Sequence, residues 1–183
     1  MNNYQILKSI SNEKIHLSLF QSIEHYRVSI LLFIVFAISF TNGLKTFTFS
    51  ELESTNVIIC IIFAFLSLIS FLYQKSRLKL ISIRTEQNDL TVFEKITELA
   101  KQKDWKIELV EKNAMVINTN RPFSSGKVFI SKSGGEKIFV FLKLNKILYR
   151  SIFDLKKGNV FVISSGENNE NEKRILEIIK ASC

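Results

Sequence analysis

The side chains that most often perform catalysis are scarce in this chain of 183 residues, and they lie far apart. Both histidines, His16 and His25, precede the first long apolar segment, and the two cysteines, Cys60 and Cys183, share no CxxC or Cys/His spacing. A serine or cysteine nucleophile needs a nearby base, and a zinc site needs clustered Cys or His ligands. We therefore expect no catalytic residue, no metal, no cofactor and no disulfide.

The acidic residues of the second half of the chain do not indicate an enzyme either. They lack the recurrent acid-x-lysine spacing of a magnesium-dependent nuclease; the acids in question are Glu108, Glu111, Glu136 and Asp154. Gly134-Gly135 is not part of a glycine-rich phosphate loop with a following lysine. It fits a hairpin turn that requires positive φ. The sequence therefore predicts a protein that is not an enzyme.

Positive charge is the clearest chemical signal. Residues 121–157 contain nine Lys and Arg but only two acids. Lysines on strands also discourage aggregation between sheets, so the functional interpretation is a basic face beside an anionic partner. The loop 118–127 either connects two strands or captures an anion with its Ser and Gly amides. The candidate anion-binding residues are Arg121, Ser124, Ser125, Gly126, Lys127, Lys143, Lys146, Arg150, Lys156 and Lys157.

Two long segments, 28–44 and 57–73, contain no charged residue. As helices, each would rise about 25 Å, against a hydrocarbon core of about 30 Å. Neither has the polar stripe of a soluble core helix, and their serines can bond to the helix backbone. We therefore expect a transmembrane hairpin over residues 28–73.

Basic residues flanking the two segments predict the orientation of the hairpin. Residues 1–27 contain three Lys and Arg and residues 74–86 contain four, whereas the connection 41–56 contains only Lys45. This asymmetry predicts a multi-pass protein of the cell (inner) membrane with both termini in the cytoplasm. The residues expected at the membrane interface are Tyr26, Arg27, Tyr73, Lys75, Arg77 and Lys79.

The remainder of the chain has the pattern of an α+β domain. Apolar spacing predicts an amphipathic helix over 89–103, capped by Asp89, and a C-terminal helix over 167–182, where Asn169 and Glu172 resemble a capping pair. Short strands with tight connections predict an antiparallel meander of about six strands, open or barrel-like. These expected strands cover 105–109, 114–120, 127–131, 136–144, 146–154 and 159–164.

These patterns divide the chain into four expected parts. Residues 1–27 form an N-terminal cytoplasmic or interfacial segment, and residues 28–73 form the transmembrane hairpin. Residues 74–88 form a basic stalk that prolongs the second helix, although the alternation of Leu78 and Leu80 with charges also suits a first strand. Residues 89–183 form the cytoplasmic α+β domain.

The order of elements resembles bacterial two-helix membrane proteins with a C-terminal PH-like domain. That resemblance implies a non-enzymatic, membrane-anchored module that binds anionic lipid headgroups or a partner protein. The order is also similar to two-helix membrane effectors of prokaryotic defence systems. This second likeness implies a β domain that binds an anionic nucleotide messenger and drives oligomerisation or membrane disruption. We expect the lipid bilayer as a partner, homo-oligomers formed through Ala64, Ser67 and Ser70, and no specific nucleic-acid binding.

Overall fold

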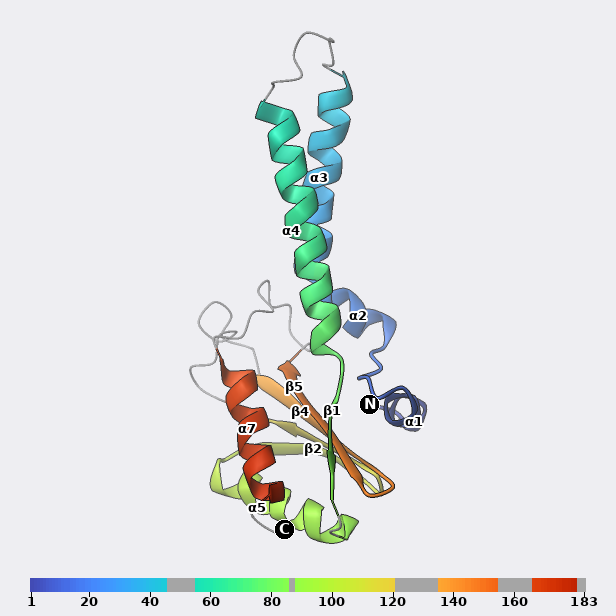
Figure 1. Cartoon of the computed structure of the whole chain (residues 1–183), viewed down its shortest axis with the longest axis vertical. Coiled ribbons are helices and arrows are strands. Elements are labelled where there is room, and N and C mark those ends of the chain that lie inside the picture. The colour runs from blue at the N-terminus through green and yellow to red at the C-terminus, as the bar shows by residue number, and fades with distance from the viewer. Residues whose placement is uncertain (46–54, 86–87, 121–134, 155–165, 181–183) are drawn as a thin grey trace.

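The structure, a computed structural model, describes residues 1–45, 55–85, 88–120, 135–154 and 166–180. Over these residues the protein is an α+β molecule in which a long helical hairpin extends from a domain built on one sheet (Figure 1). The helices are α1 (Asn3–Asn12), α2 (Leu19–His25), α3 (Arg27–Lys45), α4 (Thr55–Arg77), α5 (Asp89–Gln102) and α7 (Glu167–Lys180). The strands are β1 (Ile81–Arg84), β2 (Lys106–Glu111), β3 (Ala114–Asn118), β4 (Glu136–Lys143) and β5 (Lys146–Phe153).

The five described strands form an open antiparallel sheet in the order β1-β5-β4-β3-β2. Strands β2 to β5 make the expected meander, so the antiparallel prediction is confirmed for them, whereas the barrel-like alternative is wrong for the described sheet. The β4–β5 connection consists of Leu144 and Asn145, and Asn145 has the positive φ of 58° that a two-residue hairpin turn requires. The strands expected at 127–131 and 159–164 lie outside the described residues.

Strand β1 occupies the place of the expected stalk. Helix α4 ends at Arg77, and β1 then pairs with β5 from Ile81↔Tyr149 to Arg84↔Lys146. Leu78 and Leu80 are both buried, at 4% and 5% exposure. A helical stalk would have left these side chains in water, so the strand alternative is the one that buries them.

Each face of the sheet is covered by a different part of the chain. We call the first cluster the α5–α7 core; it comprises residues of α5 and α7 packed on Met115, Ile117, Ile138, Val140, Leu142, Ile147 and Tyr149. We call the second the N-terminal core; it comprises Ile6, Ile15, Leu78, Leu80, Ala114, Val116, Phe139, Phe141, Leu148 and Ile152. Burial of both faces explains the nearly continuous apolar sequence of β4.

The segment before the hairpin is part of the domain, which differs from the expected division of the chain. Ile6 and Ile15 are 5% and 2% exposed in the N-terminal core. The backbone continues the contact, because Ile15 N donates to Leu78 O at 2.9 Å and Leu80 N donates to Glu13 O at 3.0 Å. The domain is therefore assembled from chain on both sides of the hairpin.

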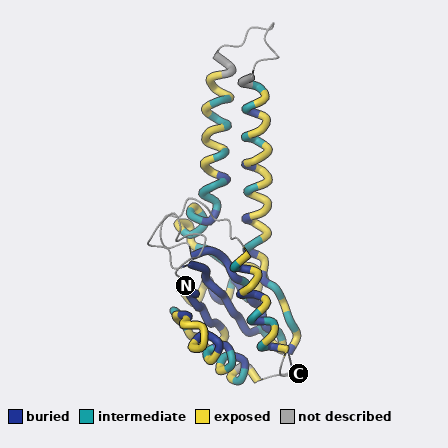
Figure 2. The backbone as a smooth tube through the Cα atoms, turned by 90° about the vertical axis from the view of Figure 1, so that its left-hand side faces the viewer, coloured by how far each residue is buried: buried dark blue, intermediate teal, exposed yellow. Residues whose placement is uncertain are grey.

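Helices α3 and α4 pack along each other and expose most of their remaining surface (Figure 2). By length and composition, α4 over Val57–Arg77 qualifies as a membrane span. Helices α2 and α3 qualify as a second span only when they are counted together across a bend of 69°. Among the described residues, these are the helices that meet the criteria for a membrane span.

Candidate functional site

The described anion-binding candidates do not share one location. Lys143 and Lys146 flank the β4–β5 turn, which lies at the end of the sheet away from α4 (Figure 1). Arg150 lies about 13 Å further along β5, where its Nε donates to Arg77 O at 3.1 Å. The other candidates lie outside the described residues: Arg121, Ser124, Ser125, Gly126, Lys127, Lys156 and Lys157.

Lys143 already has an intramolecular partner. Its Nζ lies 3.0 Å from Glu13 Oε1, and the two side chains are partly exposed. The hydrogen bond from Lys143 holds the pKa of Glu13 below its ordinary value. This pair links the end of α1 to β4 and belongs to the packing of the N-terminal segment.

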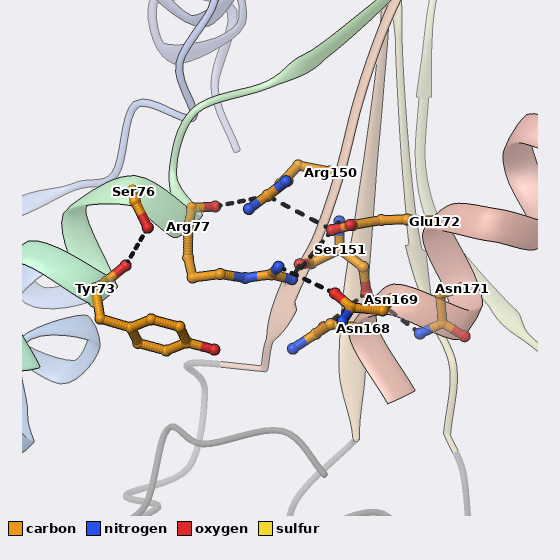
Figure 3. Close-up of polar contacts among 9 residues, drawn as sticks. All are labelled: Tyr73, Ser76, Arg77, Arg150, Ser151, Asn168, Asn169, Asn171 and Glu172. Atoms are coloured by element: carbon orange, nitrogen blue, oxygen red, sulfur yellow. Dashed lines mark hydrogen bonds and ion pairs between the residues drawn. The ribbon is translucent and has the colours of Figure 1, made fainter. Parts of the chain in front are cut away.

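A buried ionic cluster joins the end of α4 to the sheet and to α7 (Figure 3). We call Arg77, Arg150 and Glu172 the junction cluster. Arg77 Nη2 lies 3.1 Å from Glu172 Oε1, and Arg150 Nε lies 3.5 Å from the same oxygen. Glu172 Oε1 also accepts from Ser151 N at 3.1 Å, and Arg77 Nη2 donates to Ser151 O at 2.9 Å. One carboxylate therefore pairs with two guanidinium groups and accepts a hydrogen bond from a backbone amide.

The three side chains of the junction cluster are only 10–15% exposed. Burial lowers the pKa of Arg150, and the charge of Glu172 opposes that shift. Around this core, Asn168 and Asn171 bond to the Ser151 hydroxyl at 2.8 and 3.2 Å. The cluster is a structural clamp between the helical hairpin and the domain.

All three members of the junction cluster have roles that differ from those the sequence predicts. Arg77 was expected at the membrane interface, Arg150 at an anion site, and Glu172 in a helix cap; the structure instead pairs them inside the protein. A signal for Glu172 was present, because it shares a helix face with Ile175 and Ile179, both of which are buried. An acid on an apolar face predicts a buried basic partner.

The other expected interface residues surround the base of the hairpin. Tyr26 is half-buried, with its ring centroid 5.1 Å from that of Phe71 on α4. Tyr73 is 49% exposed, and Lys75 and Lys79 are exposed. In the same region, Arg27 Nη1 lies 3.5 Å from Glu24 Oε2.

Polar side chains also connect α3 to α4 at this end of the hairpin. Ser29 Oγ lies 2.7 Å from Gln74 Oε1 and 3.0 Å from Ser70 Oγ. Ser67 Oγ donates to Ser29 O at 3.0 Å. Ser67 and Ser70, which were expected to mediate self-association, therefore bond to a helix of the same chain. Homo-oligomerisation through them stays a prediction without support from this geometry.

His25 closes the junction between α2 and α4. The ring is 1% exposed, and its Nε2 donates to Gln74 O at 2.8 Å. Its Nδ1 is buried and has no hydrogen-bond partner among the described residues. Burial lowers the pKa of His25 below its ordinary value of 6.5, and the charges of Lys14 and Arg77 lower it further, whereas the bond to Gln74 raises it.

We expect acidification to destabilise the contact between α2 and α4. Because the pKa of His25 is lower in the folded protein, the unfolded state binds the proton more readily, and folding stability falls as pH drops below about 6.5. Protonation would also leave a buried N–H without an acceptor. Thermal unfolding of the detergent-solubilised chain, followed between about pH 5 and pH 7, should show this loss, and His25→Gln should flatten it. An unchanged pH profile in His25→Gln would contradict the assignment.

The described residues contain no cluster of three or more His, Cys, Asp or Glu side chains suited to holding a metal ion. No protein family, curated protein sequence or solved structure matches the chain.

Proposed function

We propose that the protein is a two-pass membrane protein whose domain is a non-catalytic binding module at the cytoplasmic bilayer surface. The observation that carries this proposal is the exposure of large apolar side chains along the α3–α4 hairpin. Phe33 is 56% exposed, Phe65 is 62% exposed and Ile69 is 58% exposed. Soluble monomers rarely expose apolar patches of more than roughly a few hundred Å², whereas lipid tails solvate such a surface.

The dimensions of the hairpin support the same proposal. Helix α4 has 23 residues and rises about 35 Å, and α3 has 19 residues and rises about 28 Å. A hydrocarbon core is about 30 Å thick, and a helix that is slightly short is accommodated by local thinning of the bilayer. The polar contacts between Ser29, Ser67 and Gln74 also satisfy hydroxyl and amide groups that would be costly in lipid.

Helix α2 has the features of an interfacial helix. It meets α3 at a bend of 69°, so it would lie close to the membrane plane when α3 crosses the bilayer. Leu19 and Phe20 are 79% and 82% exposed, and Ile23 is 49% exposed. A short helix with an exposed apolar face beside a membrane span is stabilised by insertion at the headgroup boundary.

Exposed lysines beside α4 support anionic lipid headgroups as the partner. We call Lys14, Lys75 and Lys79 the basic collar; all three are exposed, and Lys14 and Lys79 face each other in a short antiparallel bridge. Each basic residue near an anionic surface contributes about 1 kcal/mol. Lys143 is not part of the basic collar, because its Nζ is paired with Glu13 Oε1 at 3.0 Å.

Membrane extraction and thiol labelling test this proposal together. The protein should stay with membranes after alkaline extraction, because two spans resist conditions that release peripheral proteins. In a Cys60→Ser background, a cysteine introduced by Ser50→Cys, between the two helices, should react with a membrane-impermeant maleimide on intact cells. The native Cys183 should react only after permeabilisation. Release by alkali would exclude the membrane anchor, and the reverse labelling pattern would invert the orientation.

A further inference from the structure

The N-terminal segment and the sheet line a partly open cavity of about 390 Å³. It lies on the face of the sheet that the N-terminal core covers elsewhere. Its apolar lining is shared between the sheet and the N-terminal segment and includes Ile15, Leu17, Phe20, Leu109, Val116 and Phe139. The volume is at the lower end of the range of about 300–1,000 Å³ that small-molecule sites occupy.

One end of the cavity is polar and strongly charged. Lys137, which shares a strand face with Phe139, has its Nζ 2.6 Å from Glu108 Oε2 and 3.4 Å from Asp154 Oδ1. The three side chains are 6–18% exposed. Asn118 Nδ2 donates to Asp154 Oδ2 at 3.1 Å. A buried ionic cluster is weak evidence for stability, because desolvation offsets its attraction; beside a cavity, it presents hydrogen-bonding groups to a ligand.

A local irregularity of β2 places both kinds of side chain in the cavity. The register between β2 and β3 shifts between Ile107 and Leu109. As a result, the consecutive residues Glu108 and Leu109 both line the cavity, although strand neighbours ordinarily point to opposite faces. Bulges that redirect a side chain in this way are common next to functional sites.

Access to the cavity from the membrane rests on the proposed function. Phe20, Gln21 and Glu24 of α2 form part of its wall. If α2 lies at the headgroup boundary, the cavity opens beside the lipid headgroups and not into bulk cytoplasm. A hydrocarbon chain would then reach the cavity from the bilayer surface.

We propose that this cavity binds a single-chain amphiphile, or one chain of a phospholipid, that has a primary-amine headgroup. The apolar wall takes the hydrocarbon chain. At the polar end, two carboxylates (Glu108 and Asp154) surround one lysine (Lys137). Glu24, which pairs with Arg27, and the amino-terminal residue Met1 line other parts of the cavity wall. Ionised carboxylates only accept hydrogen bonds, so an ammonium group with N–H donors matches them. A choline group has no N–H donor, and an anionic headgroup would face the carboxylates.

Native mass spectrometry of the full-length protein in detergent tests this site. Three lysophospholipids of one chain length, with ethanolamine, choline or glycerol headgroups, serve as probes. We expect one equivalent of the ethanolamine lipid to bind about tenfold more tightly than the other two, as one or two additional charge-assisted hydrogen bonds would give. Equal retention of the three lipids would overturn the headgroup assignment.

Two variants separate the cavity from lipid held around the hairpin. Leu109→Trp fills the cavity and should abolish the tight equivalent, whereas Val110→Trp, on the neighbouring residue that is 58% exposed and does not line the cavity, should leave it unchanged. Asp154→Asn should remove the preference for ethanolamine over choline, whereas the hydrocarbon chain of the lipid should still bind. Circular dichroism establishes that each variant is folded; tight binding that survives Leu109→Trp in a folded protein would refute the site.

Failure of the cavity site can be distinguished from failure of the proposed function. The binding assay in detergent does not require α3 and α4 to span a membrane. If alkali releases the protein but Leu109→Trp still removes the ethanolamine lipid, the cavity site is retained and the anchor is lost. If the protein resists alkali and binds the three lipids alike, the anchor is retained and the cavity site is excluded.

Discussion

Replacing Glu172 by glutamine is expected to destabilise the protein by about 3–5 kcal/mol, because removing one partner of a buried ion pair leaves the other charge uncompensated. Here the loss leaves two guanidinium groups, those of Arg77 and Arg150, close together on side chains that are both 15% exposed. For a protein of this size, the change corresponds to a decrease in Tm of about 10 °C. Thermal unfolding of the detergent-solubilised protein, followed by circular dichroism, measures it.

The same helix provides a matched control. Glu177 is 62% exposed and lies 3.9 Å from Lys173, which is 75% exposed. An exposed pair of this kind contributes about 0–1 kcal/mol, so Glu177→Gln should leave Tm nearly unchanged. Adding Arg150→Met to Glu172→Gln should restore part of the loss, because it removes one of the two unpaired charges. Equal effects of Glu172→Gln and Glu177→Gln would show that the junction cluster does not act as a buried ionic clamp.

Local sequence patterns predicted the elements whose packing is also local. The apolar spacing of Leu90 to Leu99 predicted α5 almost to its observed bounds, and the alternating and continuous apolar stretches predicted β2 to β5. The helix cap lies one residue before the expected Asp89, because the Asn88 side chain accepts from Leu90 N at the start of α5. The two-residue connections between β2 and β3 and between β4 and β5 favour antiparallel neighbours.

The parts of the fold that the sequence did not predict depend on packing between residues far apart in the chain. Residues 13–15, after α1, and residues 78–80, before β1, lie on opposite sides of the hairpin in sequence but pair with each other, and Ile15, Leu78 and Leu80 join the same N-terminal core. No periodicity within either segment reports that contact. The junction cluster likewise pairs Arg77 with a carboxylate 95 residues away. The cavity forms where the N-terminal segment packs over a bulge in β2. A local sequence pattern predicts neither the bulge nor this packing.

The fragment 89–183, which the sequence suggests as the soluble domain, is expected not to fold by itself. It lacks β1 and the N-terminal segment, so one face of the sheet would lose the cover provided by Ile6, Ile15, Leu78 and Leu80. Burying one such side chain contributes about 1.5–3 kcal/mol, and the four together match the total stability of about 5–15 kcal/mol typical of a domain. The fragment should aggregate or unfold without a cooperative transition, as measured by circular dichroism and size-exclusion chromatography.

A rearranged chain should recover the fold without the hairpin. Residues 13–15 and 78–80 run antiparallel and share backbone hydrogen bonds, so Leu17 and Ser76 lie at the same end of this pairing. Joining residues 1–17 to residues 76–183 through a short Gly/Ser linker keeps both cores, the strand β1 and the junction cluster, and replaces only α2, α3 and most of α4. This chain should be soluble and should unfold cooperatively. A cooperative transition in 89–183 at the same temperature as in the rearranged chain would show that the N-terminal segment is not needed for the fold. Failure of both chains would mean that the helical hairpin itself contributes to folding the domain.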